Sequence, residues 1–94
     1  MTTVDWESFL SCNLTFPFNG VVSDNDGAGP IQQGDKVTVV KITGFDDKYG
    51  VIAGIKIGRR VIHFPIIDIE VADKTSPNNK PLDDYGTWFC NRHW

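Results

Sequence analysis

The sequence has 94 residues, of which 40% are hydrophobic, and a net charge of −3 at pH 7. This length suits one small domain with a modest core, and the acidic balance argues against general binding to nucleic acids or anionic membranes. Because the chain has no apolar run of about 18 residues and no basic, apolar leader at its start, we expect a protein of the cytoplasm.

The first part of this single domain (1–94), residues 1–14, carries a helical pattern. A short amphipathic helix is predicted from Val4 to Cys12, and Asn13 is a reasonable end signal for it. Its expected apolar side consists of Val4, Trp6, Phe9 and Leu10.

Residues 16–73 contain β-branched and apolar runs separated by turn formers, which predicts five short strands. In chain order we expect these strands at residues 20–23, 36–43, 49–57, 60–64 and 69–72. A long loop follows the first strand, and Gly58-Arg59 makes a tight hairpin between the third and the fourth. Pro65 interrupts the pattern, so Ile66–Asp68 is expected to form a helical turn before the last strand.

These connections are typical of a mainly β fold, a five-stranded SH3-like barrel that closes most of its sheet edges. An OB-fold is the alternative, but it usually needs a helix where Gly58-Arg59 leaves no room. The last part, residues 74–94, begins as a polar linker and is expected to form a helix from Pro81 to Arg92. Apolar residues at helical spacing would dock this helix on the barrel: Leu82, Tyr85, Trp88 and Phe89.

Two cysteines, Cys12 and Cys90, lie near opposite ends of the chain. A disulfide between them is geometrically feasible, but disulfides are rare in the reducing cytosol. We therefore expect two buried, reduced thiols.

The segment Thr43–Gly50 is the most informative part of the chain. Two adjacent carboxylates, those of Asp46 and Asp47, lie there in a turn between two strand-like runs, and the carbonyls of a surface turn are free to bind a ligand. Carboxylates and carbonyls are the ligands of a hard cation, above all calcium. Aspartate is also simply a good turn former, so both interpretations stay open at this point.

The SH3-like topology brings further carboxylates towards this turn. The first loop, the second loop and the helical turn lie at one rim of such a barrel, where we expect convergence of Asp24, Asp26, Asp46, Asp47 and Asp68. Clustered carboxylates repel one another unless a cation neutralises them, which favours a metal site. The alternative is a solvated acidic rim that Lys36 and Lys48 partly neutralise. The first loop is no EF-hand, because Ala28 occupies a ligand position and the flanking segments are strands.

Other kinds of chemistry find little support in the sequence. No catalytic constellation and no phosphate-binding glycine loop rises above chance, so we expect no enzymatic activity. Lys56, Arg59 and Arg60 would form a basic tip at the other end of the barrel. Three cations on a negatively charged chain do not predict nucleic-acid binding.

Several segments, in the same order and across nearly the whole chain, resemble a known family. They are Thr15-Phe16-Pro17-Phe18, Gly34-Asp35-Lys36-Val37, Asp46-Asp47-Lys48-Tyr49-Gly50, the run from Phe64 to Val71, Ser76-Pro77-Asn78 and the run from Asp84 to Arg92. The sequence is similar there to the small calcium-binding proteins first recognised in cyanobacteria, the CcbP-like family. The resemblance implies an SH3-like acidic domain that binds calcium weakly through surface carboxylates, with Asp46 and Asp47 as ligands, and acts as a calcium buffer or signalling protein.

The leading hypothesis is therefore a non-enzymatic calcium-binding protein. The expected ligands are the carboxylates of Asp46, Asp47, Asp68, Asp24 and Asp26 and a carbonyl of Phe45 or Tyr49. Because such a site is open and carried by loops, its dissociation constant should be on the order of 10⁻⁴ M. The alternative is an SH3-like interaction module whose acidic rim binds a basic peptide or protein without metal.

Overall fold

The computed structural model describes residues 2–23 and 31–91. In chain order its elements are α1 (Thr3–Asn13), β1 (Phe18–Val22), β2 (Lys36–Asp46), β3 (Gly50–Ile57), β4 (Arg60–Pro65), the 3₁₀ helix η1 (Ile66–Asp68), β5 (Ile69–Val71) and α2 (Asn79–Asn91). No helix in these two ranges is long and apolar enough to cross a membrane.

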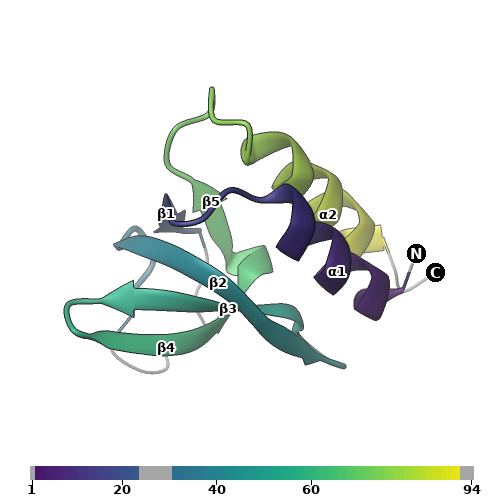
Figure 1. Ribbon diagram of the computed structural model, residues 1–94, viewed down its shortest axis with the longest axis horizontal. Coiled ribbons are helices and arrows are strands. Elements are labelled where there is room, and N and C mark those ends of the chain that lie inside the picture. The colour runs from purple at the N-terminus through teal and green to yellow at the C-terminus, as the bar shows by residue number, and fades with distance from the viewer. Residues whose placement is uncertain (1, 24–30, 92–94) are drawn as a thin grey trace.

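The five strands form one antiparallel sheet in the order β4-β3-β2-β1-β5 (Figure 1). The prediction of a mainly β fold with five strands and a helix at each end is confirmed. The sheet is not a closed barrel, however, because β4 and β5 lie at its two edges and do not pair with each other in the described part of the chain. The short edge strand β5 has only three residues, and all of them pair with β1.

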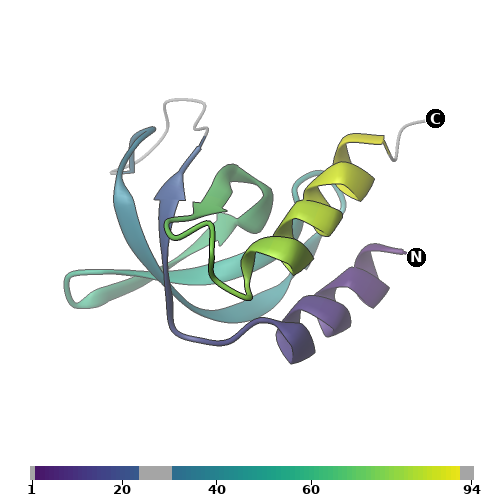
Figure 2. The same cartoon turned by 90° about the horizontal axis from the view of Figure 1, so that it is seen from above.

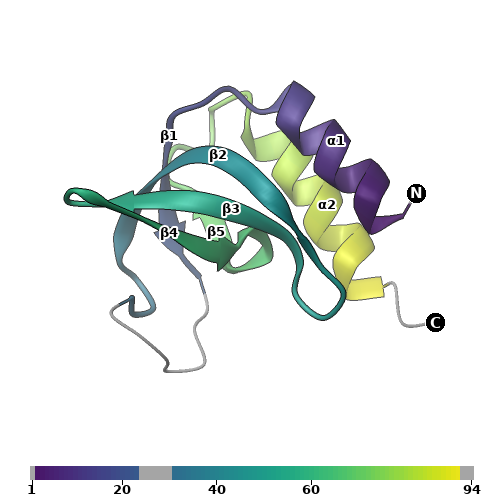
Figure 3. The same cartoon turned by 60° about the horizontal axis from the view of Figure 1, so that its bottom comes forward.

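Strand β2 is longer than predicted and bends along its length (Figure 3). Its register with β3 shifts between Val39 and Lys41 and again between Ile42 and Gly44, and such bulges bend a strand and increase its twist. The predicted end at Thr43 is wrong, because the ladder continues through Gly44 and Phe45 to the pair between Asp46 and Gly50. The turn itself is therefore confined to residues 47–49.

One face of the sheet is covered by the two helices, which lie side by side (Figures 1 and 2). Alternate residues of the strands point into this layer because side chains alternate between the faces of a strand. The buried hydrophobic core consists of Trp6, Leu10, Leu14, Phe18, Val22, Ile31, Val37, Val39, Val51, Ala53, Ile55, Ile66, Ile69, Val71 and Tyr85.

Helix α1 begins with a capping box, in which the Thr2 side chain and the Asp5 carboxylate each accept a hydrogen bond from the other residue's backbone N–H. Trp6 and Leu10 are buried as predicted, but Val4 is 52% exposed. The expectation for Val4 is wrong because, at about 100° per residue, it lies roughly 200° around the helix from Trp6.

Helix α2 docks through the residues that the helical spacing predicted. Tyr85 is buried, and Leu82, Trp88 and Phe89 pack partly buried against the core. The Trp6 ring of α1 contacts the rings of Tyr85 and Trp88, with centroid distances of 5.5 Å and 5.8 Å. The two helices therefore share an aromatic interface.

Both cysteines, Cys12 and Cys90, are free and exposed. The expectation of two buried thiols is wrong. Each cysteine lies on a helix and is exposed, so packing does not protect its thiol.

Candidate metal site

The turn between β2 and β3 is held together by Asp46. One carboxylate oxygen, Oδ1, accepts hydrogen bonds from the backbone N–H groups of Lys48 (2.8 Å) and Tyr49 (3.0 Å). This is the local hydrogen bonding that makes aspartate a turn former. Asp46 therefore has a structural role in the hairpin, as the alternative interpretation of the sequence required.

The same hydrogen bonds keep Asp46 charged. Donation from the N–H of Tyr49, and then from that of Lys48, lowers the pKa of the Asp46 carboxyl below its ordinary value of 3.8. The carboxylate is exposed and ionised at neutral pH. Both backbone donors bind Oδ1 and neither binds Oδ2.

An open groove of about 890 Å³ lies beside this hairpin. We call it the acidic groove. Its lining residues come from the hairpin, the end of β4, η1 and the C-terminal part of α2: Thr43, Gly44, Phe45, Asp46, Lys48, Tyr49, Ile52, His63, Phe64, Pro65, Ile67, Asp68 and Phe89.

The structure brings together only part of the predicted ligand set. Asp46, Tyr49 and Asp68 all line the acidic groove, although η1 is far from the hairpin in sequence. Asp47 lies in the exposed turn and is not among the groove's lining residues. Asp24 and Asp26 fall in the segment 24–30, which lies outside the described residues.

The acidic groove does not contain a dense cluster of metal-binding side chains. Nowhere in residues 2–23 and 31–91 do three or more His, Cys, Asp or Glu side chains lie in an arrangement that could hold a metal ion. The carboxylate pair of Asp46 and Asp68 is therefore the core of the candidate site. A calcium ion takes 6–8 oxygen ligands, so backbone carbonyls and water would have to complete its shell.

Asp68 is anchored by its place in the fold rather than by a turn of its own. Asp68 is the last residue of η1, which lies between β4 and β5, and the residue is half-buried. The backbone carbonyl of Asp68 accepts a hydrogen bond of 2.7 Å from the N–H of Ser23. This bond ties the groove wall to the residue that follows β1.

Helix α2 fixes the position of the acidic hairpin from behind. The buried phenol oxygen of Tyr85 accepts a hydrogen bond from the backbone N–H of Val51 at 2.9 Å. Gly50 has a φ of +76°, and a side chain there would collide with the phenol of Tyr85 and with the Phe89 ring. Figure 3 shows the β2–β3 turn beside the C-terminal end of α2.

Sequence reasoning missed the aromatic character of the acidic groove. Phe45 and Tyr49 flank the two aspartates and are 44% and 43% exposed, and Phe89 reaches the groove from α2. The ammonium of Lys48 lies 5.2 Å from the centre of the Tyr49 ring, a cation–π contact. The available signal was the presence of two large aromatic residues within a polar surface turn.

His63 forms part of the same wall. Its Nδ1 lies 3.0 Å from the hydroxyl of Thr43 on the neighbouring end of β2. The Thr43 hydroxyl also lies 3.3 Å from the carbonyl of Ile52, to which it can donate. The pair of His63 and Thr43 links β2 to β4 across β3.

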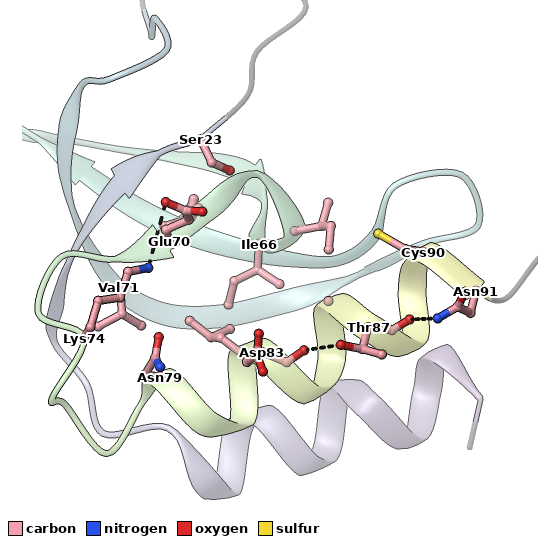
Figure 4. Close-up of a pocket in the computed structure, with 14 residues that line it drawn as sticks. Ser23, Ile66, Glu70, Val71, Lys74, Asn79, Asp83, Thr87, Cys90 and Asn91 are labelled. Atoms are coloured by element: carbon pink, nitrogen blue, oxygen red, sulfur yellow. Dashed lines mark hydrogen bonds and ion pairs between the residues drawn. The ribbon is translucent and has the colours of Figure 1, made fainter.

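A second, smaller groove of about 480 Å³ runs between α2 and β5 (Figure 4). None of the predicted ligands that fall within the described residues lines it. Several of its polar groups pair with one another: Lys74 with Glu70, the Thr87 hydroxyl with the carbonyl of Asp83, and the Asn91 amide with the carbonyl of Thr87. Because the described residues hold no group of three metal-binding side chains there, we do not assign it a metal.

The predicted basic tip lies at the far end of β3 from the acidic hairpin (Figure 3). Its three predicted cations, Lys56, Arg59 and Arg60, are exposed, as are the neighbouring Ile57, Gly58 and Val61. The two hairpins thus place opposite charges at opposite ends of the same strand.

Comparisons with known proteins identify the family and the fold of the chain. Residues 2–89 match the family model Calci_bind_CcbP, which is described as calcium binding. The crystal structure of Anabaena CcbP superposes with a TM-score of 0.72 at 22% sequence identity, and the match covers 93% of this chain and 72% of that one. At that identity the structural likeness supports the fold. No curated protein matches the sequence.

Proposed function

The chain belongs to the CcbP family of calcium-binding proteins, so calcium is the ion that it binds, and we propose that the acidic groove holds this ion between Asp46 and Asp68. The observation that carries the proposal is the pair of carboxylates from two distant segments that line one groove. One of the two is kept ionised by backbone hydrogen bonds. Oxygen ligands of this kind suit a hard cation such as calcium.

The remaining ligands are proposed from what lies next to these carboxylates. The backbone carbonyls of Phe45 and Tyr49 belong to residues that line the groove, and water would complete the shell. Asp47 neighbours Asp46 at the tip and would add negative charge to the site. Asp24 and Asp26, outside the described residues, stay sequence-based candidates.

A site of this kind would bind weakly. It has two carboxylates in an open groove, and open sites with few charged ligands fall in the range of roughly 10⁻⁴ to 10⁻³ M. This affinity suits a buffer or a sensor of high local calcium rather than a permanent structural ion. We propose that the protein acts through calcium binding and not through catalysis.

Calorimetric titration with calcium tests the assignment. Asp46→Asn preserves an oxygen that can accept the hydrogen bonds of Lys48 and Tyr49, so the turn is kept while the charge is lost. We expect Asp46→Asn and Asp68→Asn each to raise the dissociation constant by about tenfold, which is about 1.4 kcal/mol.

Asp83→Asn is the matched control. Asp83 is exposed on α2 and lines the second groove rather than the acidic one. The control removes the same charge from the protein, so its dissociation constant should stay close to that of the wild type. Equal weakening by all three variants would mean that only the net charge matters and would overturn the site.

A further inference from the structure

The acidic groove and the basic tip are complementary in both charge and hydrophobicity. The exposed large hydrophobic side chains of the described chain are few. Phe45 and Tyr49 both line the acidic groove, and only Val4 lies away from both surfaces. Ile57 and Val61 lie at the basic tip at 38% and 49% exposure, one on each face of the β3–β4 hairpin, because Ile57 is opposite Arg60 and Val61 is opposite Lys56. Exposed aromatic side chains that line one groove and are rimmed by polar residues are typical of an interaction surface.

The two surfaces carry net charges of opposite sign. The carboxylates of Asp46 and Asp68 outnumber the ammonium of Lys48 along the groove, whereas the tip carries Arg59 and Arg60 beside Ile57 and Val61. Complementary charges orient two surfaces and accelerate their encounter. The basic tip, with its arginines and aliphatic side chains, is therefore complementary to the carboxylates and aromatic rings of the groove.

The groove already accommodates a cation beside an aromatic ring. The Lys48 ammonium lies over the ring of Tyr49, and arginine interacts with aromatic faces even more often than lysine. Arg59 or Arg60 of an incoming chain would find the same ring together with the carboxylates of Asp46 and Asp68.

The two surfaces cannot meet within one molecule. They lie at opposite ends of β3, whose eight residues span about 26 Å at roughly 3.3 Å per residue. Any contact between them must join two copies of the chain. Because groove and tip are different surfaces, such a contact is head-to-tail and leaves one free groove and one free tip.

We propose that the acidic groove of one chain binds the basic tip of a second copy, so that the protein associates head-to-tail in a concentration-dependent way. Both surfaces are small, which predicts a weak and reversible contact. The contact does not need calcium, and it is therefore tested with calcium removed by a chelator.

Two variants, each blocking one surface, separate the halves of the contact. Phe45→Ala with Tyr49→Ala removes two exposed groove side chains, and Arg59→Glu with Arg60→Glu reverses the charge of the tip. All four residues are exposed, so both variants should fold, as amide NMR spectra will show. If the groove variant does not fold, Asp46→Asn with Asp68→Asn replaces it.

Sedimentation velocity then gives the result. We expect the wild type to form larger species as its concentration rises to about 1 mM, the range in which small interfaces associate. Each variant alone should stay monomeric. An equimolar mixture should form a 1:1 dimer and nothing larger, because one variant retains its tip and the other its groove.

Val4→Ala and the pair Lys74→Glu with Lys80→Glu are the controls, since they change exposed residues outside both surfaces. They should associate as the wild type does. A wild type that stays monomeric to about 1 mM, or a mixture that does not dimerise, would overturn the proposal. Calcium binding is measured in a separate titration, so the absence of self-association would not imply the absence of a calcium site in the groove, and the reverse also holds.

Discussion

The backbone N–H of Val51 donates a 2.9 Å hydrogen bond to the phenol oxygen of Tyr85, and this bond connects the acidic hairpin to α2. Val51 is the second residue of β3, immediately after the acidic turn. The phenol lies in the core beside the Trp6 ring. The position of the acidic groove therefore depends on how α2 packs.

Tyr85→Phe should destabilise the fold without changing its shape. The substitution removes the buried acceptor of the Val51 N–H, and an unsatisfied buried donor costs about 1–3 kcal/mol. Denaturation with urea measures the free energy of unfolding. Tyr49→Phe removes a hydroxyl from an exposed tyrosine and should change stability by less than about 0.5 kcal/mol. Equal effects of the two variants would show that the buried hydrogen bond adds nothing.

Gly50→Ala should be far more costly than Gly58→Ala. Both glycines have positive φ, +76° and +60°, so alanine strains the backbone at either position, by about 1–2 kcal/mol. Only at Gly50 would the new methyl group also meet Tyr85 and Phe89, whereas nothing lies within 4 Å of it at Gly58. Overpacking should add a further 1–3 kcal/mol or so. The difference between the two melting midpoints measures how closely Tyr85 and Phe89 of α2 pack against the hairpin. Equal midpoints would contradict this packing.

Asn78→Ala should loosen the link between the two helices. The buried Asn78 side chain accepts from the N–H of Thr15 (2.7 Å) and donates to its carbonyl (2.9 Å). Because Thr15 is exposed, water can replace the lost partner, so each of the two lost hydrogen bonds should cost about 0.5–1.5 kcal/mol. The control, Asn91→Ala, removes a single exposed hydrogen bond to Thr87 and should be nearly neutral in the same unfolding experiment. If both variants unfold at the same denaturant concentration, the two hydrogen bonds between Asn78 and Thr15 do not stabilise the fold.

The hairpin should respond to acid at lower pH than an ordinary aspartate. The pKa of Asp46 is lowered in the folded state by the N–H groups of Tyr49 and Lys48. Its contribution to stability is therefore fully present above its unfolded pKa, near 3.8, and is lost as the pH falls through the lower folded value. Between pH 5 and 8 this group adds no pH dependence.

Amide NMR provides the measurement for Asp46. The N–H resonances of Lys48 and Tyr49 should move together with a midpoint below pH 3.8, and Asp46→Asn should abolish this movement. Thr75, whose hydroxyl and N–H lower the pKa of Asp73 in the same way, is an internal reference that the variant leaves unchanged. A midpoint at or above 3.8 would show that the turn hydrogen bonds do not hold the carboxylate.

Local patterns in the sequence predicted the elements well, because strand alternation and helical spacing are set by neighbouring residues. The tight hairpin at Gly58-Arg59 and the helical turn at Ile66–Asp68 occur as predicted. One missed feature depended on distant contacts: closure of the barrel requires its edge strands to meet, and three-residue β5 pairs only with β1. The exposure of Val4 was a local error, because helical geometry places Val4 away from the side of α1 that carries Trp6.

The candidate site was predicted in outline and not in detail. The topology argument expected Asp46 and Asp68 in one place, and both line the acidic groove. It could not show that Asp46 extends β2 and organises the turn, since this depends on the register with Gly50. Nor could it show that Phe89 from α2 would line the groove, because a buried aromatic residue and a groove residue look alike on a helical pattern.

The most direct test of the account is a calcium titration followed by amide NMR. If calcium binds in the acidic groove, the resonances of residues 44–50 and of Asp68 should shift together and saturate in the millimolar range, on the order of the affinity expected for an open site. The double variant Asp46→Asn with Asp68→Asn should lose these shifts while Asp83→Asn keeps them. Shifts confined to residues outside the groove, or unchanged in the double variant, would contradict the site proposed for this calcium-binding protein.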